Sequence, residues 1–265
     1  MMTTGRVALL SLAAMLSACQ SGGPEIPAPT GTVLRVASYN IRHGRGMDNE
    51  VNLDRTAAVL RRLQPDIVGL QEVDSVVERS GRVAEAQALG ERLGMQHAFG
   101  GFMAYQGGQY GMGILSRYPI QLVRSVRLPD GNEPRIALAV EVAAPGIGPL
   151  MVVNVHFDWV ASDSFRIVQA TALTRFLDSL PMPYILLGDF NDEPGSRTLG
   201  LFQARAREAA KPAGNRLTFS STDPVKEIDF IFAAPAARWR SDSIAVIAET
   251  VASDHRPIFA RLHWR

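Results

Sequence analysis

The chain has 265 residues, 46% of them hydrophobic and 20% charged, which allows a large buried core and excludes wholesale disorder. Its 27 basic and 26 acidic residues give a formal net charge of +1, and so nearly neutral a chain does not favour tight, sequence-independent nucleic-acid binding, which needs a basic surface. Because Cys19 is the single cysteine, an intrachain disulfide and a cysteine-based zinc site are excluded.

The chain begins with a segment typical of export signals. Arg6 precedes an apolar run, Val7 to Leu16, that is too short for a membrane span, which takes about 20 residues. A cation, a short apolar run and small residues predict a signal peptide over residues 1–18.

The residues around Cys19 predict a lipid anchor. Leu16 to Cys19 resembles a bacterial lipobox, which implies cleavage before Cys19 and a lipid on its sulfur. The alternative is an ordinary signal peptide with an incidental cysteine. Gln20, rather than Asp, follows, which by analogy with lipoprotein sorting favours an outer-membrane anchor facing the periplasm if the cell is Gram-negative. Residues 19–31 are rich in small and turn-forming residues and are expected to form a flexible tether.

A single domain is expected over residues 32–265, because no repeat or compositional break interrupts it. Alternating apolar and polar residues predict a first strand over 34–41, and an apolar stripe at helical spacing predicts a helix over 53–63. Further strands are expected over 67–70, 112–116, 120–126, 136–142, 150–155, 184–187, 228–232, 244–247 and 257–262. Further helices are expected over 84–93, 165–180 and, from a weaker pattern, 199–209. Many strands with few helices between them predict a layered α/β or α+β fold.

Polar side chains recur at the ends of the apolar strands, where a core cannot use them. They are Asn40, Glu72, His156, Asp189, Asn191, Asp229, Asp254 and His255. Ligand sites gather at one end of a sheet in layered folds, so these residues are expected to meet there. Carboxylates, amides and imidazoles without a thiolate suit a hard cation such as Mg²⁺.

Seven short motifs together resemble the endonuclease/exonuclease/phosphatase superfamily. They are Ser38–Ile41, Gln71–Val73, Gly111–Ser116, Asn154–His156, Gly188–Asn191, Glu227–Phe232 and Ser253–Pro257, and they appear in the order of that family. The resemblance extends over residues 33–264 and implies a four-layer α/β/β/α sandwich, in which two β-sheets are flanked by helices. It also implies hydrolysis of phosphate esters with Mg²⁺ or Mn²⁺ at the open end of the sandwich.

The resemblance assigns metal binding to three residues. Glu72 is the principal expected ligand, Asn40 assists it, and Asp254 is a second candidate carboxylate. Mg²⁺ keeps several waters and needs few protein carboxylates, and this small ligand set is therefore sufficient. The alternatives are a surface carboxylate for Glu72, a turn residue for Asn40 and a cap before Pro257 for Asp254.

The resemblance also assigns the catalytic groups. It pairs His255 with Asp229 as a dyad that takes a proton from water or stabilises phosphate charge. It assigns to Asp189 the transfer of the proton of the nucleophile or leaving group. It assigns to Asn191 the binding of the charge that develops in the reaction. His156 is expected to hydrogen-bond the scissile phosphate. The alternatives are a structural ion pair for the dyad, a self-bonded turn at Asp189 and Asn191, and a satisfied histidine at 156.

A few further residues are candidates for the cleft. Arg135 is expected to bind phosphate by resemblance to short family members, and a solvated edge arginine is the alternative. Weaker candidates for the cleft are Arg42, His43, Tyr105, Tyr110 and Trp159. His97 and His263 are expected to be structural.

Three functions remain to be separated. The first is a monomeric Mg²⁺-dependent phosphoesterase, anchored through Cys19, that acts outside the cytoplasm on a small or lipid-linked phosphomonoester or diester. The second is an extracytoplasmic nuclease, which would require an electropositive groove ringed by Arg42, Arg45, Arg135 and Arg166. The third, a non-catalytic binding module, is disfavoured because the set of candidate catalytic residues is complete.

Overall fold

The computed structural model of the chain describes residues 1, 2 and 31–265. The predicted signal peptide beyond residue 2, the lipobox at Cys19 and the predicted tether up to residue 30 therefore lie outside the described residues. Gly31 to Arg265 forms one compact unit. Among the described helices, none combines the length and apolar character needed to cross a membrane.

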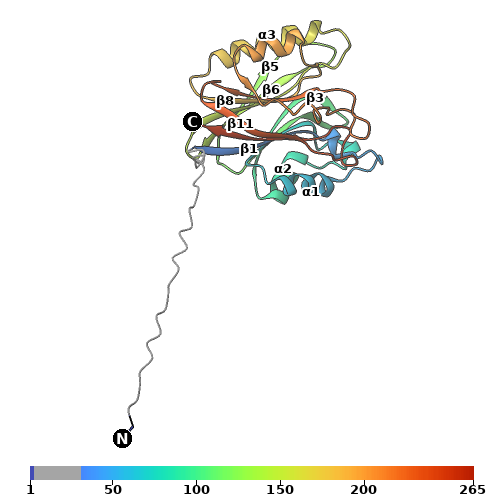
Figure 1. The fold of residues 1–265 in the computed structure, drawn as a ribbon. Coiled ribbons are helices and arrows are strands. Elements are labelled where there is room, and N and C mark those ends of the chain that lie inside the picture. The colour runs from blue at the N-terminus through green and yellow to red at the C-terminus, as the bar shows by residue number, and fades with distance from the viewer. Residues whose placement is uncertain (3–30) are drawn as a thin grey trace. The chain divides into compact units, whose positions relative to one another are not determined.

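Two six-stranded mixed sheets are stacked on each other (Figure 1). The first sheet has the order β11 (Trp239–Val246), β12 (Ile258–Trp264), β1 (Thr32–Asn40), β2 (Ile67–Ser75), β4 (Gly108–Ser116) and β3 (Gln96–Tyr105). The second sheet has the order β5 (Ile120–Arg127), β6 (Ile136–Ala144), β7 (Gly148–His156), β8 (Tyr184–Asp189), β10 (Asp229–Ala234) and β9 (Arg207–Glu208).

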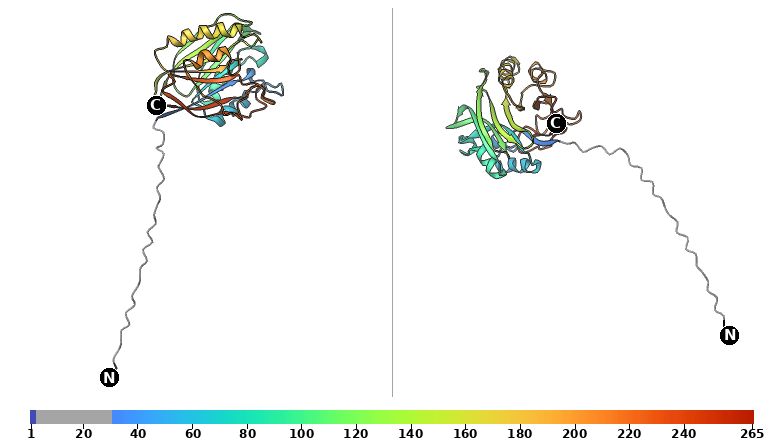
Figure 2. Two further views of the ribbon diagram at one scale, coloured as in Figure 1. Left: turned by 45° about the horizontal axis from the view of Figure 1, so that its top comes forward. Right: turned by 90° about the vertical axis from the view of Figure 1, so that its left-hand side faces the viewer.

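Helices cover the outer face of each sheet (Figures 1 and 2). The first sheet packs against α1 (Leu53–Leu63) and α2 (Glu85–Leu93), and the second against α3 (Ser164–Asp178) and α4 (Arg197–Gln203). Two short 3₁₀ helices, η1 (Arg42–Gly44) and η2 (Glu78–Ser80), follow β1 and β2. The predicted four-layer α/β/β/α sandwich is thus confirmed.

The apolar core lies in three layers because the central strands bury both faces. Along β1, Leu34 and Val36 pack between the two sheets, whereas Ala37 and Tyr39 pack beneath α1 and α2. Side chains two residues apart share a face of a strand, which produces this division. A third cluster, which includes Phe190 and Phe202, fills the space between the second sheet and α3 and α4.

The structure corrects two of the predicted elements. No strand was expected over 96–105, yet β3 is the edge strand of the first sheet. The helix expected over 199–209 is α4, which ends at Gln203, because residues 207–208 instead pair with Phe232 and Ala233 of β10 as the short strand β9. The other predicted elements are present, several of them longer than expected.

Candidate active site

Strand pairing gathers the predicted site residues at one edge of the sandwich. In the parallel pair β1–β2, Asn40 at the end of β1 lies beside Gln71, the residue before Glu72. In the parallel pair β7–β8, His156 lies beside Asp189. The carboxyl ends of parallel strands point the same way, and β10 runs antiparallel so that it begins at Asp229, opposite Asp189. Residues separated by up to about 215 positions therefore share one site.

A buried amide network joins the two sheets beneath this edge. Gln71 Nε2 donates to Asn154 Oδ1 at 2.6 Å and to Ser38 Oγ at 3.2 Å. Asn154 Nδ2 donates to the carbonyl oxygens of Leu70 and Gly113 at 2.8 and 2.9 Å. Buried polar groups that are hydrogen-bonded in this way favour one arrangement of the strands, although Gln71 Oε1 has no partner among the described residues. This role was not predicted from the sequence, although a buried asparagine in an apolar strand is a signal for it.

Glu72 projects from a β-bulge. The register of β2 against β4 shifts between Leu70 and Val73, and Glu72 adopts the left-handed conformation with φ of 54°. A non-glycine residue held there costs about 1–3 kcal/mol, which the surrounding structure must offset. Burial raises the pKa of Glu72, and the nearby carboxylate of Asp254 adds to the effect.

Asn40 lies between the predicted metal ligand and the predicted catalytic carboxylate. Its Nδ2 donates to Glu72 Oε1 at 3.0 Å and to Asp189 Oδ2 at 3.1 Å, while its Oδ1 accepts from the backbone N–H of Arg42 at 3.1 Å. The nitrogen of the amide thus faces the carboxylates. In this orientation Asn40 holds Glu72 in place, and direct ligation through its oxygen would need the opposite orientation of the amide plane.

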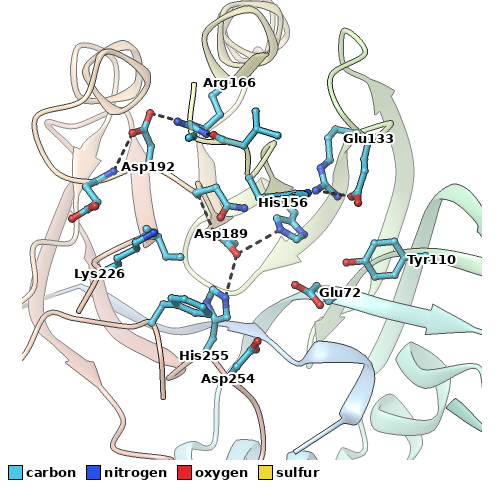
Figure 3. Close-up of a pocket in the computed structure, with 18 residues that line it drawn as sticks. Glu72, Tyr110, Glu133, His156, Arg166, Asp189, Asp192, Lys226, Asp254 and His255 are labelled. Carbon is cyan, nitrogen blue, oxygen red and sulfur yellow. Dashed lines mark hydrogen bonds and ion pairs between the residues drawn. The ribbon is translucent and has the colours of Figure 1, made fainter. Parts of the chain in front are cut away.

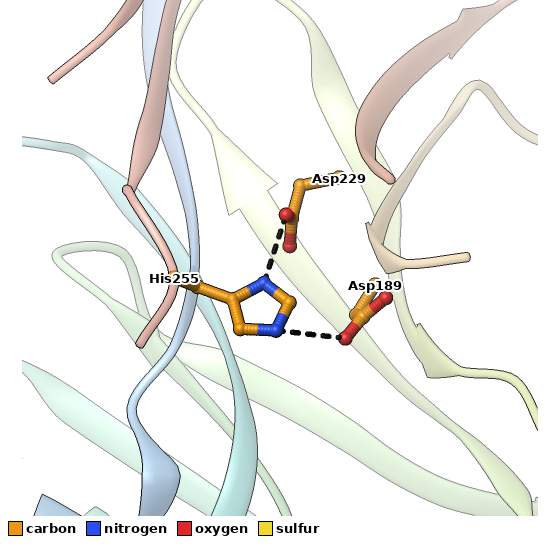
Figure 4. Close-up of side chains that lie close together, drawn as sticks. All are labelled: Asp189, Asp229 and His255. Carbon is orange, nitrogen blue, oxygen red and sulfur yellow. Dashed lines mark hydrogen bonds and ion pairs between the residues drawn. The ribbon is translucent and has the colours of Figure 1, made fainter. Parts of the chain in front are cut away.

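His255 lies between two buried aspartates (Figure 4). Its Nδ1 is 3.0 Å from Asp229 Oδ2, and its Nε2 is 3.5 Å from Asp189 Oδ2. Burial alone would lower the pKa of His255, but the Asp229 and Asp189 carboxylates outweigh it and raise the pKa to about 10. Burial raises the pKa of Asp189 to about 7, against the opposing effect of the charged imidazole. The two carboxylates therefore favour the protonated, imidazolium form of His255.

His156 and Asn191 complete the surroundings of Asp189. His156 Nε2 lies 3.6 Å from Asp189 Oδ2. Burial, with Arg135 and His255 adding to it, lowers the pKa of His156 well below its ordinary value, so this ring is neutral. The backbone N–H of Asn191 donates to Asp189 Oδ1 at 2.9 Å, and Asn191 Nδ2 donates to the carbonyl of Phe157 at 3.0 Å. Asn191 thus fixes the turn that aims Asp189.

Arg135 is a buried cation at the wall of the site. Its side chain is 1% exposed, lies over the ring of Phe102 at 5.2 Å and contacts Glu133 Oε2 through Nη2 at 3.0 Å. Its Nε and Nη1 have no hydrogen-bond partner among the described residues. This burial excludes the alternative of a solvated edge arginine, and it leaves two buried guanidinium donors without a protein partner.

These residues surround a cavity of about 560 Å³ (Figure 3). The predicted site residues that line it are Glu72, Arg135, His156, Asp189, Asn191, Asp254 and His255. Asn40 and Asp229 lie behind this lining, in contact with Glu72 and His255 respectively. Of the weaker candidates, Tyr110 and Trp159 line the cavity, whereas Arg42, His43, Arg45 and Tyr105 are not among its lining residues.

Several groups at the rim were not predicted from the sequence. They are Glu133, Asp192, Glu193, Phe219 and Lys226. Only the position of Asp192, directly after Asn191, was a signal in the sequence. Arg166, named there only for a nuclease, lies at the rim too, and its Nε is 3.3 Å from Asp192 Oδ2. Both buried arginines of the cavity, Arg135 and Arg166, therefore have a carboxylate partner.

Acidic side chains outnumber basic ones in the cavity. Its carboxylates belong to Glu72, Glu133, Asp189, Asp192, Glu193 and Asp254, and its lysine and arginine side chains are Arg135, Arg166 and Lys226. Carboxylates crowded in this way repel one another and favour a bound cation. The same excess opposes a polyanionic ligand.

Known proteins resemble this chain over most of its length. The uncharacterized protein YbhP of Escherichia coli K12 is 27% identical over 248 residues, which cover 86% of this chain and 96% of YbhP. A solved endonuclease/exonuclease/phosphatase from Bacteroides vulgatus is 25% identical with a TM-score of 0.72, and the match covers 88% of this chain and 100% of that one. A mannosyl-6-phosphatase of Bacteroides thetaiotaomicron is 20% identical with a TM-score of 0.70 over 86% of this chain and 99% of that one, a likeness that shows the fold alone.

The family to which the chain belongs is shown by a family model that matches most of the domain. The model of the endonuclease/exonuclease/phosphatase family matches residues 37–255, a stretch that includes every predicted site residue from Asn40 to His255. This chain belongs to the endonuclease/exonuclease/phosphatase family of metal-dependent phosphoester hydrolases.

Proposed function

We propose that the chain is a Mg²⁺- or Mn²⁺-dependent phosphoesterase that hydrolyses a small phosphate ester outside the cytoplasm. The main support is one cavity in which Glu72 lies beside the Asp189–His255–Asp229 group, within a predominantly acidic lining. Export and lipid anchoring through Cys19 rest on the lipobox-like sequence, and a monomer is the expected state.

The donor set of the cavity fits a hard divalent cation. Glu72 would hold it, with the nearby Asp254 as a second ligand, because oxygen ligands suit Mg²⁺ and Mn²⁺. Asp189, Asp229 and His255 also have atoms within 4.8 Å of one another, a spacing that could hold a metal ion. A protonated His255 offers no lone pair, so we favour Glu72. When bound, the cation would neutralise phosphate charge and polarise the phosphorus–oxygen bond.

The remaining groups divide the work of hydrolysis. The unpartnered donors of Arg135 and the neutral ring of His156 would bind the phosphate oxygens. Asp189 would accept the proton of the attacking water, since it lies at the centre of the site and burial raises its pKa to about 7, a value that suits a general base. The imidazolium of His255, held by Asp229, would stabilise the negative charge that develops on the phosphate.

A small substrate suits the cavity better than a nucleic acid. A nuclease would need a basic groove, yet Arg135 and Arg166 are both paired with carboxylates. One structural neighbour with the same fold is named a mannosyl-6-phosphatase, which is compatible with a small phosphomonoester. The nuclease remains the second candidate, since Lys226 is an exposed cation at the rim.

A comparison of substrates tests the proposal. Purified protein with Mg²⁺ is expected to hydrolyse a small aryl phosphomonoester, an aryl phosphodiester or a lysophospholipid. Plasmid DNA should be cleaved about 100-fold more slowly in kcat/KM, because the cavity lacks an attractive field for a polyanion. The assays are release of the alcohol or of phosphate and gel analysis of the plasmid. Comparable rates on plasmid and small esters would instead establish the nuclease.

A further inference from the structure

Arg79, which the proposed chemistry does not use, occupies a crowded position behind the cavity. It lies in η2, and its guanidinium lies over two aromatic rings, 4.7 Å from the centre of the Tyr105 ring and 5.2 Å from that of Tyr110. Its Nε and Nη2 donate to the two carboxylate oxygens of Asp74 at 2.8 and 2.9 Å. Asp74 is fully buried and the Arg79 side chain is 28% exposed, so this bidentate pair is partly shielded from water.

Two of the partners of Arg79, Asp74 and Tyr110, adjoin the bulge that carries Glu72. Asp74 follows Glu72 by two residues on β2, and it pairs in register with Tyr110 of β4. The backbone N–H of Asp74 also donates to Glu85 Oε2 on α2 at 2.8 Å. Tyr110 lines the cavity beside Glu72, and its hydroxyl points into the cavity in Figure 3. Arg79 therefore contacts both strands at the place where their register is interrupted.

The same stack continues toward the phosphate-binding arginine. The rings of Tyr110 and Phe102 meet edge to face at 5.1 Å, and the guanidinium of Arg135 lies over Phe102 at 5.2 Å. The wall of the cavity is thus a continuous series of cation–ring and ring–ring contacts from Arg79 to Arg135. Such contacts resist displacement because each ring has a neighbour on its face or edge.

We propose that Arg79 is a positioning residue that holds the Glu72 carboxylate in the geometry needed to bind a divalent cation. The left-handed conformation of Glu72 persists only if the neighbouring structure fixes it, and Asn40 restrains the carboxylate rather than the backbone. Arg79 fixes the backbone on the far side of the bulge through Asp74 and fixes the facing strand through Tyr110. The inference rests on the proposed metal role of Glu72.

Arginine is the residue type that this position requires. A guanidinium can bind both oxygens of Asp74 in its plane while its two faces pack on aromatic rings, whereas a lysine ammonium is a point charge with no face. Lysine at 79 would keep the charge but lose the fork and the double stack. The Arg79→Lys variant therefore keeps the positive charge and tests the contribution of the guanidinium geometry.

The test measures metal affinity without any substrate. Isothermal titration calorimetry with Mn²⁺ should show about a tenfold weaker Kd for Arg79→Lys than for the wild type, at the lower end of the usual effect of residues that orient metal ligands. Arg82→Lys is the matched control, because Arg82 follows the same 3₁₀ turn, is 58% exposed and, among the acidic groups of the described residues, pairs with Glu78 Oε2 alone. Its Kd should stay within about twofold of the wild type, as expected for an exposed ion pair.

Two more variants make the outcome decisive. Glu72→Gln should weaken Mn²⁺ binding more than Arg79→Lys; if it does not weaken binding at all, the proposed metal site is wrong. If Glu72→Gln weakens binding and Arg79→Lys binds Mn²⁺ like the wild type, only the role of Arg79 is wrong. Should Arg79→Lys fail to fold, Tyr105→Leu removes one face of the stack at a half-exposed residue, and an unchanged Kd there would equally overturn the inference.

Discussion

Replacing Asp189 with asparagine is expected to lower kcat about 10³-fold, within the usual range for a positioned proton-transfer group. The amide has the same shape and can still accept from the backbone N–H of Asn191, so the turn should survive. It cannot accept the proton of the attacking water, and so the chemical step should slow while substrate binding changes little. Steady-state kinetics on the best substrate, with thermal melting to confirm folding, measures both quantities.

A surface aspartate supplies the matched control for this substitution. Asp178 is half exposed at the end of α3 and pairs with Arg205, far from the cavity lining. Asp178→Asn should leave kcat unchanged and shift the melting temperature slightly, because an exposed ion pair contributes little. If Asp189→Asn keeps more than half of the wild-type kcat, Asp189 does not transfer the proton.

Replacing His255 with alanine is expected to lower kcat about 10²- to 10⁴-fold, because the charge that stabilises the phosphate is lost. Asp229→Asn should lower kcat less, since it weakens the hold on the ring but leaves the ring in place. The double variant should be about as slow as His255→Ala alone, because Asp229 acts through His255. Kinetics on all three variants tests this coupling.

The loss of His255 also affects the protonation of its two aspartate partners. Removing His255 leaves Asp189 and Asp229 as buried carboxylates without a cation between them, so one of them is expected to take up a proton. The variants should therefore be compared across a range of pH. If the fold-losses in kcat of the two single variants multiply in the double variant at every pH, Asp229 acts independently of His255, which would contradict the dyad.

The position of most site residues could be predicted because each ends an apolar strand. Asp189 and His156 close β8 and β7, and the fold places strand ends of parallel pairs together. The left-handed conformation of Glu72 could not be predicted, since the polar residues after Leu70 end the apolar pattern while the strand continues to Ser75. The orientation of the Asn40 amide likewise depends on Glu72 and Asp189, which are distant in sequence, as well as on the nearby backbone of Arg42.

Strand β3 shows why one element of the fold was missed. It contains Gly100 and Gly101, which interrupt the apolar alternation and favour a loop on sequence grounds. In the structure, a side chain at Gly100 would meet Ile136 of the second sheet at 2.8 Å, so the absence of a side chain permits the two sheets to approach. The glycine therefore reflects packing between the sheets, which the local pattern does not contain.

The rim of the cavity was also beyond local prediction. Glu133, Arg166 and Lys226 come from separate loops and a helix start, and their proximity is a property of the whole fold. The same holds for Arg79, whose partners lie 5 to 31 residues away along the chain. Sequence motifs predicted a chemistry for the site, whereas the groups that support it required the three-dimensional arrangement.

The central claim is that the cavity around Glu72 and Asp189 hydrolyses phosphate esters only with a divalent cation. The most direct test is the rate of phosphoester hydrolysis by chelator-treated protein as Mg²⁺ is added back. We predict a rate at background without metal and a saturable recovery with Mg²⁺, which Mn²⁺ reproduces and Asp189→Asn protein does not show. Undiminished hydrolysis after complete removal of divalent cations would contradict the account.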